Sequence, residues 1–134
     1  ICFFAAAASA QSNEGLFWIR ENGKYGYIDR TGKTVIEPQY ENTMGFNEGL
    51  AATRMNGKYG YIDTKGNWAI QPQFEFTYMF SDGLGMVRVG KQYAWIDKTG
   101  KQVIAPQDFE ETAAGCSEGR LAVKRGGQWG YIDK

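Results

Sequence analysis

The chain has 134 residues and a mass of 15.0 kDa, which suits one compact array and excludes the two-domain plan of many large cofactor enzymes. Fifteen Lys and Arg balance fifteen Asp and Glu, so we expect no nucleic-acid partner and no attraction to an anionic membrane. Because the sequence holds no His, nucleophiles paired with an imidazole base and zinc sites with His ligands are excluded.

The amino end has the pattern of a targeting segment. Residues 1–12 carry no charge and combine an apolar run with small residues at Ala8 and Ala10. This pattern predicts a truncated signal peptide over residues 1–10 with an Ala-Ser-Ala cleavage site, and a short buried helix or strand is the alternative. A membrane span is not expected, because about ten apolar residues fall short of the roughly 20 that a span needs. The protein is therefore predicted to be exported to the periplasm, the outer surface or the extracellular space.

One sequence unit recurs through the rest of the chain, residues 11–134. Its core recurs at offsets of 34, 34 and 36 positions as Lys24–Asp29, Lys58–Asp63, Gln92–Asp97 and Gln128–Asp133. The units are 14–47, 48–81, 82–117 and a partial unit 118–134. Since the last unit stops before its Pro-Gln segment, we expect further units to follow it.

These residues resemble the WG-repeat family, whose units read as Glu-Gly-Leu, Trp-Gly-Tyr-Ile-Asp, Thr-Gly-Lys and Ile-x-Pro-x-Tyr. The resemblance covers residues 14–134, although only Trp129-Gly130 shows the name-giving dipeptide and Tyr93-Ala94 departs furthest from it. Members of this family are found among bacterial secreted and surface proteins and share no general catalytic activity. The resemblance therefore implies an interaction module, with no cofactor and no functional residues to carry over.

Each unit is expected to open with a β-hairpin. In the first unit, Leu16–Glu21 and Lys24–Asp29 are strand-like and flank Asn22-Gly23, a strong signal for a type I′ turn. The later units have residue pairs at the same place that also suit a two-residue hairpin turn with positive φ, namely Asn56-Gly57, Gly90-Lys91 and Gly126-Gly127. A two-residue turn fixes the register, so Arg20 is predicted to face Tyr25, and each unit is predicted to set a cation beside an aromatic ring.

A third strand is expected after the turn Arg30-Thr31-Gly32, running through Val35-Ile36 and stopping at Pro38. The fold class is thus all-β, a tandem array of antiparallel three-stranded meanders of about 34 residues. A short fourth segment near Phe46 and Phe80 is an additional expectation. Such small sheets must stack to bury their apolar faces, in an open solenoid-like or a propeller-like arrangement.

The packing within this stack can also be predicted in part. The unit position held by Gly60 and Ala94 is interpreted as a slot beside a large neighbour across the unit interface, where Ala is tolerated. Tyr40, Phe74 and Phe109 are expected in the core, and Cys116 is interpreted as a small buried apolar residue. Of the two faces of each sheet, one is expected to be buried between units and the other half-exposed.

Two sets of side chains could carry chemistry. The repeated Asp29, Asp63, Asp97 and Asp133 are interpreted as turn residues that accept backbone hydrogen bonds, because no calcium-loop pattern accompanies them. Neither a metal site nor a catalytic residue is predicted. The candidate residues for contact with a partner are the aromatic side chains and the acidic residues near the insertion in the third unit, namely Trp18, Tyr25, Tyr59, Tyr93, Trp129, Asp108, Glu110 and Glu111.

The sequence leaves two hypotheses for function open. The first is a non-catalytic exported repeat module, not an enzyme, that acts as a scaffold or binds a protein or an envelope component. The alternative is a module that binds a cell-wall glycan or another polysaccharide through exposed Tyr and Trp side chains. The oligomeric state is not predicted.

Overall fold

The computed structural model describes residues 15–134, apart from the side chains of residues 114–117. Within this part, all of the regular secondary structure is β-strand. No helix in it is long and apolar enough to cross a membrane. The strands are β1 (Phe17–Glu21), β2 (Lys24–Ile28), β3 (Thr34–Tyr40), β4 (Asn42–Thr43), β5 (Leu50–Met55), β6 (Lys58–Asp63), β7 (Trp68–Phe74), β8 (Phe76–Thr77), β9 (Gly85–Val89), β10 (Gln92–Ile96), β11 (Gln102–Gln107), β12 (Glu111–Ser117), β13 (Arg120–Arg125) and β14 (Gln128–Asp133). The predicted signal peptide lies outside the described residues.

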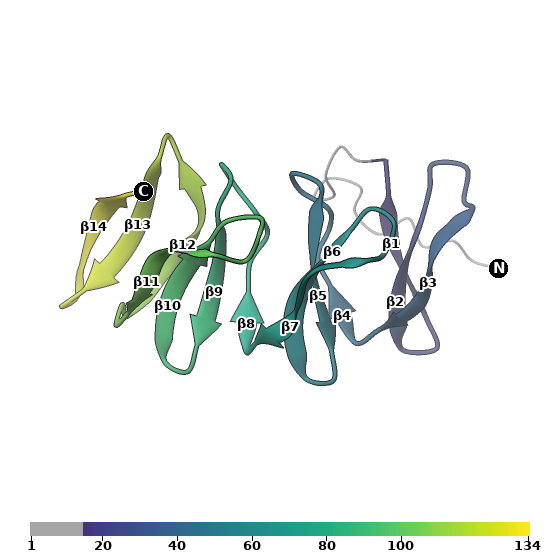
Figure 1. Cartoon of the computed structure of the whole chain (residues 1–134), viewed down its shortest axis with the longest axis horizontal. Helices are drawn as coiled ribbons and strands as arrows, with labels where there is room; N and C mark the ends of the chain where they lie inside the picture. Colours follow the sequence, from purple (N-terminus) through teal and green to yellow (C-terminus); the bar gives the residue numbers. More distant parts are fainter. Residues whose placement is uncertain (1–14) are drawn as a thin grey trace.

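The strands form four antiparallel sheets that follow one another along the long axis of the molecule (Figure 1). In order, these are β1-β2-β3, β4-β5-β6-β7, β8-β9-β10-β11 and β12-β13-β14. The first and last of them lie at opposite ends of the array, which over residues 15–134 does not close on itself (Figure 1). The predicted all-β array of repeated meanders is confirmed.

The hairpin turns have the backbone conformations that the sequence predicts. Asn22 and Gly23 have φ values of 50° and 80°, and Asn56 and Gly57 have 51° and 78°, as a type I′ turn requires. The register follows from these turns, since Arg20 pairs with Tyr25 and Arg54 with Tyr59. The turn after β2 is also as predicted, with Gly32 at φ 86°.

The third and fourth strands differ from the prediction. β3 and β7 continue through Pro38 and Pro72 instead of stopping there, because both are edge strands and each Pro lies in a bulge. The fourth strands are β4 and β8, which precede Phe46 and Phe80 and pair with the following hairpin. Phe46 and Phe80 themselves are fully buried between sheets.

Gly60 lies in a confined space, as predicted, but the atoms that confine it belong to its own sheet and not to a neighbouring unit. A Cβ atom at Gly60 would lie 2.4 Å from the backbone oxygen of Ile70 and 2.7 Å from the nitrogen of Pro72, both in the same sheet. The slot therefore lies under the bulge of β7, and a large side chain across the interface does not form it. The expectation that Ala is tolerated at residue 60 is consequently wrong.

Ala94 fits because the bulge opposite it is smaller. Glu37–Gln39 lie between the residues of β3 that pair with Tyr25 and Tyr27, whereas only Ala105–Pro106 lie between the corresponding residues of β11. One residue fewer in the bulge removes backbone from the space above residue 94. The presence of Ala94 in the third unit is therefore no evidence that a Cβ atom fits at Gly60.

The core is built by one rule of sheet packing. In each hairpin, the aromatic face carries the repeated Tyr or Trp residues, such as Tyr59 and Tyr61, and the isoleucine face carries residues such as Gly60 and Ile62. The aromatic face of each sheet packs on the isoleucine face of the next. The three resulting clusters pair Tyr27, Ile36, Tyr40 and Phe46 with Ala51 and Ile62; Tyr61, Ile70, Phe74 and Phe80 with Val87, Ala94 and Ile96; and Leu84, Met86, Trp95 and Phe109 with Leu121 and Val123.

Replacement of Gly57 by Val tests the hairpin turn. Gly57 has φ 78° and no atom lies within 4 Å of the place that a Cβ would take, so the cost comes from the backbone conformation alone. We expect Gly57→Val to lower the free energy of unfolding by about 1–3 kcal/mol in urea denaturation. Lys58→Val, in the strand that follows, is the control and should change it less. Equal effects of the two variants would contradict the turn assignment.

Candidate interaction surface

The aromatic residues that the sequence nominates for partner contact do not share one exposed face. Trp18 and Tyr25 pack edge to face with ring centroids 5.7 Å apart and lie half-buried against the first core cluster. Tyr59 is buried, with its hydroxyl accepting a hydrogen bond from Asn42 at 3.1 Å, and Tyr93 is half-buried. Between sheets both faces are covered, so the expectation of one half-exposed layer is wrong for the inner sheets.

Buried Tyr hydroxyls tie neighbouring sheets together. The Tyr27 hydroxyl donates to the carbonyl oxygen of Met44 at 2.6 Å, and the Tyr61 hydroxyl donates to that of Tyr78 at 2.6 Å. Each hydroxyl also contacts a Thr hydroxyl of the next sheet, Thr43 or Thr77. The third unit has Trp95 at this position, and there Thr112 donates to the Met86 sulfur at 2.7 Å. The buried Tyr hydroxyls of the first two interfaces are thus hydrogen-bonded to the next sheet.

An alkaline titration tests this burial. Burial raises the pKa of the Tyr27 and Tyr61 hydroxyls above the ordinary value of 10.0. Their contribution to stability is therefore complete below pH 10.0 and is lost progressively above it, as the unfolded chain ionises first. We expect both to form tyrosinate only as the far-UV circular dichroism signal is lost, with Tyr61→Phe removing part of that late absorbance. Complete ionisation of all Tyr residues in the intact fold would contradict the assignment.

A second set of links between sheets comes from the acidic residue of each Glu-Gly or Asp-Gly turn. Glu48, at φ 53°, accepts a hydrogen bond from the Gly83 amide at 3.0 Å and lies 3.6 Å from the Lys98 ammonium. Lys98 also donates to the Glu48 backbone oxygen at 2.8 Å. This contact joins residues that lie 35 positions apart in the sequence and belong to different units.

The same link recurs one sheet further on. Asp82, also at φ 53°, accepts from the Gly119 amide at 3.1 Å and pairs with the Lys134 ammonium at 2.9 Å. We call this arrangement of an acidic turn residue, an amide and a cation the turn link. Each turn link lies near the surface and contributes little to stability, and it joins a turn of one unit to a turn of the next.

The acidic residues near the insertion have partners inside the chain. Glu110 accepts from the Gly127 amide at 3.1 Å, and this carboxylate caps the β13-β14 turn. Glu111 forms an ion pair of 2.9 Å with Lys124, and this contact raises the pKa of the Lys124 ammonium. Asp108 is exposed. Glu110 and Glu111 therefore have structural contacts at the positions where partner contact is predicted.

Three of the four repeated Asp residues, Asp29, Asp63 and Asp97, act within their turns, as the sequence predicts. The Asp29 carboxylate accepts from the Thr31 hydroxyl at 2.6 Å and from the Thr31 amide at 2.8 Å, and these contacts hold the pKa of Asp29 below its ordinary value. Asp97 is bound in the same way by Thr99. Asp133 instead lies 3.8 Å from the Arg120 guanidinium. Among the described residues, no group of three metal-ligating side chains gathers.

The predicted contacts between cations and rings form in two units. Arg20 and Arg54 lie 5.6 Å and 5.9 Å from the ring centroids of Tyr25 and Tyr59. Arg88 instead donates to the carbonyl oxygen of Gly90, and Lys124 pairs with Glu111. For these two residues the predicted strand partners, Tyr93 and Trp129, are confirmed, and a nearer acceptor takes the cation.

Within residues 15–134, one aromatic face is exposed, on the last described sheet. Its residues are Ala122, Lys124, Trp129 and Tyr131, and we call it the terminal aromatic face. Trp129 is 54% exposed and Tyr131 is 74% exposed, whereas the equivalent Tyr27 and Tyr61 are fully buried. Large exposed aromatic side chains gathered on one sheet face are typical of an interaction surface.

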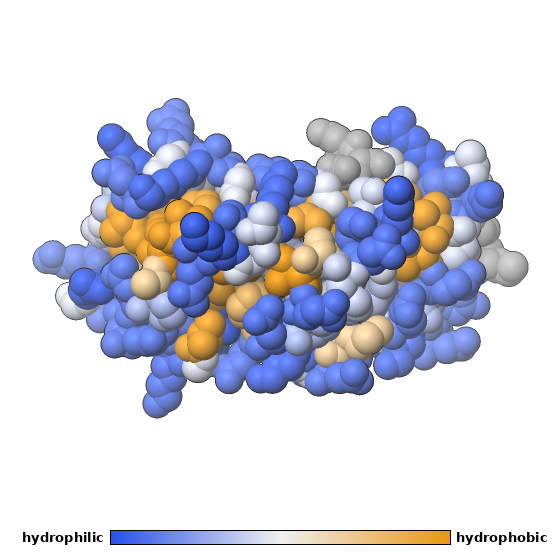
Figure 2. Space-filling model, in the orientation of Figure 1, coloured by the Kyte–Doolittle hydropathy of each residue, from blue (hydrophilic) through white to orange (hydrophobic). Residues whose placement is uncertain are grey.

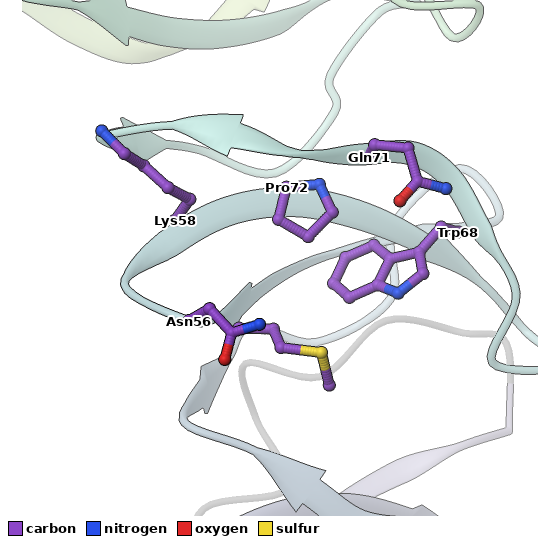
Figure 3. Close-up of a pocket in the computed structure, with 6 residues that line it drawn as sticks. Asn56, Lys58, Trp68, Gln71 and Pro72 are labelled. Atoms are coloured by element: carbon purple, nitrogen blue, oxygen red, sulfur yellow. The ribbon is translucent and has the colours of Figure 1, made fainter.

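A shallow hollow of about 270 Å³ lies beside the β5-β6 turn and β7. Figure 3 shows the rings of Trp68 and Pro72 next to each other, with Asn56 opposite and Lys58 extending at the rim. Its remaining lining residues are Met55 and Gln71. In Figure 2, hydrophilic residues predominate on the face in view, and apolar residues form a band across its middle.

Sequence reasoning finds Trp129 but misses Tyr131 and Trp68. Tyr131 belongs to the repeated core segment, so its pattern is identical to that of the buried Tyr27 and Tyr61. The signal that distinguishes it is the absence of a described sheet on its own side. Trp68 follows a turn as part of a third strand, where no repeated aromatic pattern draws attention to it.

Comparison with known families agrees with the repeat. A family model described as "WG containing repeat" matches three tandem segments, residues 25–59, 59–93 and 93–129. No curated protein and no solved structure matches the chain.

Proposed function

The chain belongs to the WG containing repeat family, and we propose that it is a non-catalytic module that binds a protein or an envelope component through its terminal aromatic face. The observation that carries the proposal is the exposure of Trp129 and Tyr131, 54% and 74%, side by side on the last sheet that the structure describes. Tyr and Trp are enriched where proteins bind one another, because each combines a large apolar area with a polar group. Lys124, which is paired with Glu111, lies on the same face.

Export from the cytoplasm is the second part of the proposal. It rests on the uncharged apolar run of residues 1–12 and its small residues at Ala8 and Ala10. Mass spectrometry of the protein recovered outside the cytoplasm should give a chain that begins at Gln11. Recovery of the uncleaved chain from the cytoplasm alone would contradict export.

Photo-crosslinking in producing cells tests the binding surface. A benzophenone-bearing residue is placed at position 131, and the control places it at Val89, an apolar residue that is 45% exposed on another sheet. We expect protein adducts from position 131 that are absent from position 89. Equal adducts from both positions, or none from either, would contradict the proposed surface.

A second candidate function is saccharide binding at the hollow beside Trp68. The ring faces of Trp68 and Pro72 offer the apolar stacking surface that a sugar ring needs, and Asn56 and Gln71 offer amide groups for its hydroxyls. A glycan array with the wild type and Trp68→Ala tests this candidate, with Trp129→Ala as the matched variant. Loss of binding in Trp68→Ala alone supports the hollow, whereas loss in Trp129→Ala alone favours the terminal aromatic face as the glycan site.

A further inference from the structure

The hollow beside Trp68 contains two rings that the fold holds in place. Trp68 packs edge to face against Tyr40 of the preceding sheet, with ring centroids 5.8 Å apart and an interplanar angle of 82°. Pro72 lies in the bulge of β7, between the residues that pair with Tyr59 and Tyr61. Both rings are thus positioned by packed strands in the middle of the array, so little ordering of these side chains is needed when a ligand binds.

The polar groups around these rings favour an anion. The lining contains one ammonium group, that of Lys58 at the rim, two side-chain amides and no carboxylate (Figure 3). Within the described part of the chain, no ion pair involves Lys58. The carboxylate that contacts the adjoining turn, Glu41, accepts from the Gly57 amide at 3.1 Å and lies 3.7 Å from the Nε of Arg54. The Lys58 ammonium is therefore available to an anionic group of a ligand.

Among the first three units, only the second combines a ring, a cation and amides at these positions. In the first unit the ring is replaced by Thr34, and two of the other positions carry the acidic residues Glu21 and Glu37. In the third unit the ring and the cation are both replaced by Gln, at Gln102 and Gln92. Strands β3 and β11 still form, so the third strand of a unit does not need a ring at this place. The hollow therefore distinguishes the second unit from its neighbours.

We propose that this hollow binds a hexuronic acid residue of an acidic polysaccharide. The apolar face of the pyranose ring stacks on Trp68 and Pro72, and the sugar carboxylate accepts a hydrogen bond from the Lys58 ammonium. The side-chain amides of Asn56 and Gln71 form hydrogen bonds with the ring hydroxyls. The inference rests on the second candidate function, saccharide binding at the hollow, and names the class of saccharide.

The size and exposure of the hollow set the expected strength of binding. Its volume of about 270 Å³ lies just below the range of roughly 300–1,000 Å³ that is typical for drug-sized ligands, so it suits one sugar residue. A hydrogen bond between an ammonium and a carboxylate is about twice as strong as one between neutral groups. Because the site is open to solvent, dissolved ions screen this attraction. We therefore expect weak binding that weakens further as the salt concentration rises.

Matched acidic and neutral sugars test the carboxylate contact. The probes are trimers of galacturonate, glucuronate and mannuronate and their methyl esters, which keep the ring and the hydroxyls but lose the charge. In an NMR titration of the ¹⁵N-labelled protein, we expect at least one acid trimer to shift the indole signal of Trp68. Its methyl ester should bind about two- to fivefold more weakly, on the scale of one exposed ion pair. If no trimer binds, or if acid and ester bind equally, the inference is overturned.

Two Lys variants at equivalent exposed positions give the matched comparison. Lys58→Gln should lower the affinity for the acid trimer to that for the ester and leave the affinity for the ester unchanged. Lys24→Gln, in the first unit, should change neither affinity. Equal effects of the two variants would show that the net charge of the protein attracts the acid, and would overturn the inference.

A peptide of three Glu residues tests whether the ligand must be a sugar. It carries the same number of side-chain carboxylates as the acid trimers but has no pyranose ring to stack on Trp68. We expect it not to shift the Trp68 indole signal at concentrations where the acid trimer does. Binding as tight as that of the trimer would favour an acidic peptide as the ligand and would overturn the inference.

The outcomes separate this inference from the function on which it rests. If acid and ester bind equally and Trp68→Ala abolishes both, the hollow binds saccharides and only the acidic class is wrong. If no saccharide binds, the candidate function and the inference are both wrong, whereas crosslinking at position 131 still decides the terminal aromatic face. If Trp129→Ala abolishes binding and Trp68→Ala does not, the site is on the terminal aromatic face and the inference is overturned. The comparison of Lys58→Gln with Lys24→Gln does not depend on whether Trp68→Ala folds.

Discussion

Gly60→Ala is expected to lower the free energy of unfolding by about 3 kcal/mol, the upper end of the usual cost of overpacking. The added methyl group would lie 2.4 Å from the Ile70 oxygen and 2.7 Å from the Pro72 nitrogen. Both atoms are backbone, so neither can rotate away as the end of a long side chain would. Relief requires the bulge of β7 to move, which disturbs the pairing of Tyr59 with Phe74.

The chain contains its own control for this variant. Gly130 occupies the same unit position in the last sheet, where no third strand is described and no atom lies within 4 Å of an added Cβ. Gly130→Ala should therefore be neutral or slightly stabilising, because Ala restricts the unfolded chain more than Gly does. Urea denaturation of both variants measures the difference. Similar effects at the two positions would show that the bulge does not restrict residue 60.

The hairpins and their register could be predicted because they depend on local chemistry. Two residues with positive φ between strand-like segments leave one way to pair the strands, and Asn22-Gly23 supplies them without help from the rest of the chain. The Asp29 turn is likewise local, since all of its hydrogen bonds lie within four residues. These features follow from the sequence within one unit.

The bulges and the choice of faces could not be predicted in the same way. Gly60 lies under a bulge whose size depends on how many residues separate Ile70 from Phe74. That number is set in β7, so it cannot be predicted from the sequence of β6, which contains Gly60. Ala94 misleads because its own bulge is one residue shorter. The two faces of each sheet are both apolar, so period-two alternation gives no preference for which one is covered. Covering both requires the stack itself.

The site residues show the same division. Repetition identifies Tyr27, Tyr61 and Tyr131 as equivalent, yet their exposure differs from 0% to 74% because only the first two have a sheet packed over them. Exposure at such a position is a property of the place in the array and not of the unit sequence. A candidate list drawn from the unit pattern therefore mixes core residues such as Tyr59 with surface residues such as Trp129.

Tyr61→Ala and Tyr131→Ala measure this difference directly. Tyr61 is fully buried against Val87 and Ile96, and its hydroxyl donates to the Tyr78 carbonyl oxygen at 2.6 Å. Truncating it leaves a cavity and removes a buried hydrogen bond, so we expect a loss of about 3–5 kcal/mol in the free energy of unfolding. Tyr131→Ala, measured on dilute monomer, should change the same quantity by less than about 0.5 kcal/mol.

The contrast between the two variants depends on the packing rule and on nothing else in the unit. Both residues follow a Gly in the same strand position and both precede Ile-Asp, so their local propensities cancel in the comparison. Tyr61→Phe separates the contribution of the hydrogen bond from that of the ring, because it removes the hydroxyl and keeps the ring. We expect it to lower the free energy of unfolding by about 1–2 kcal/mol. If Tyr131→Ala destabilised the monomer as much as Tyr61→Ala, the terminal aromatic face would be covered in solution, and the surface on which the binding proposal rests would not exist.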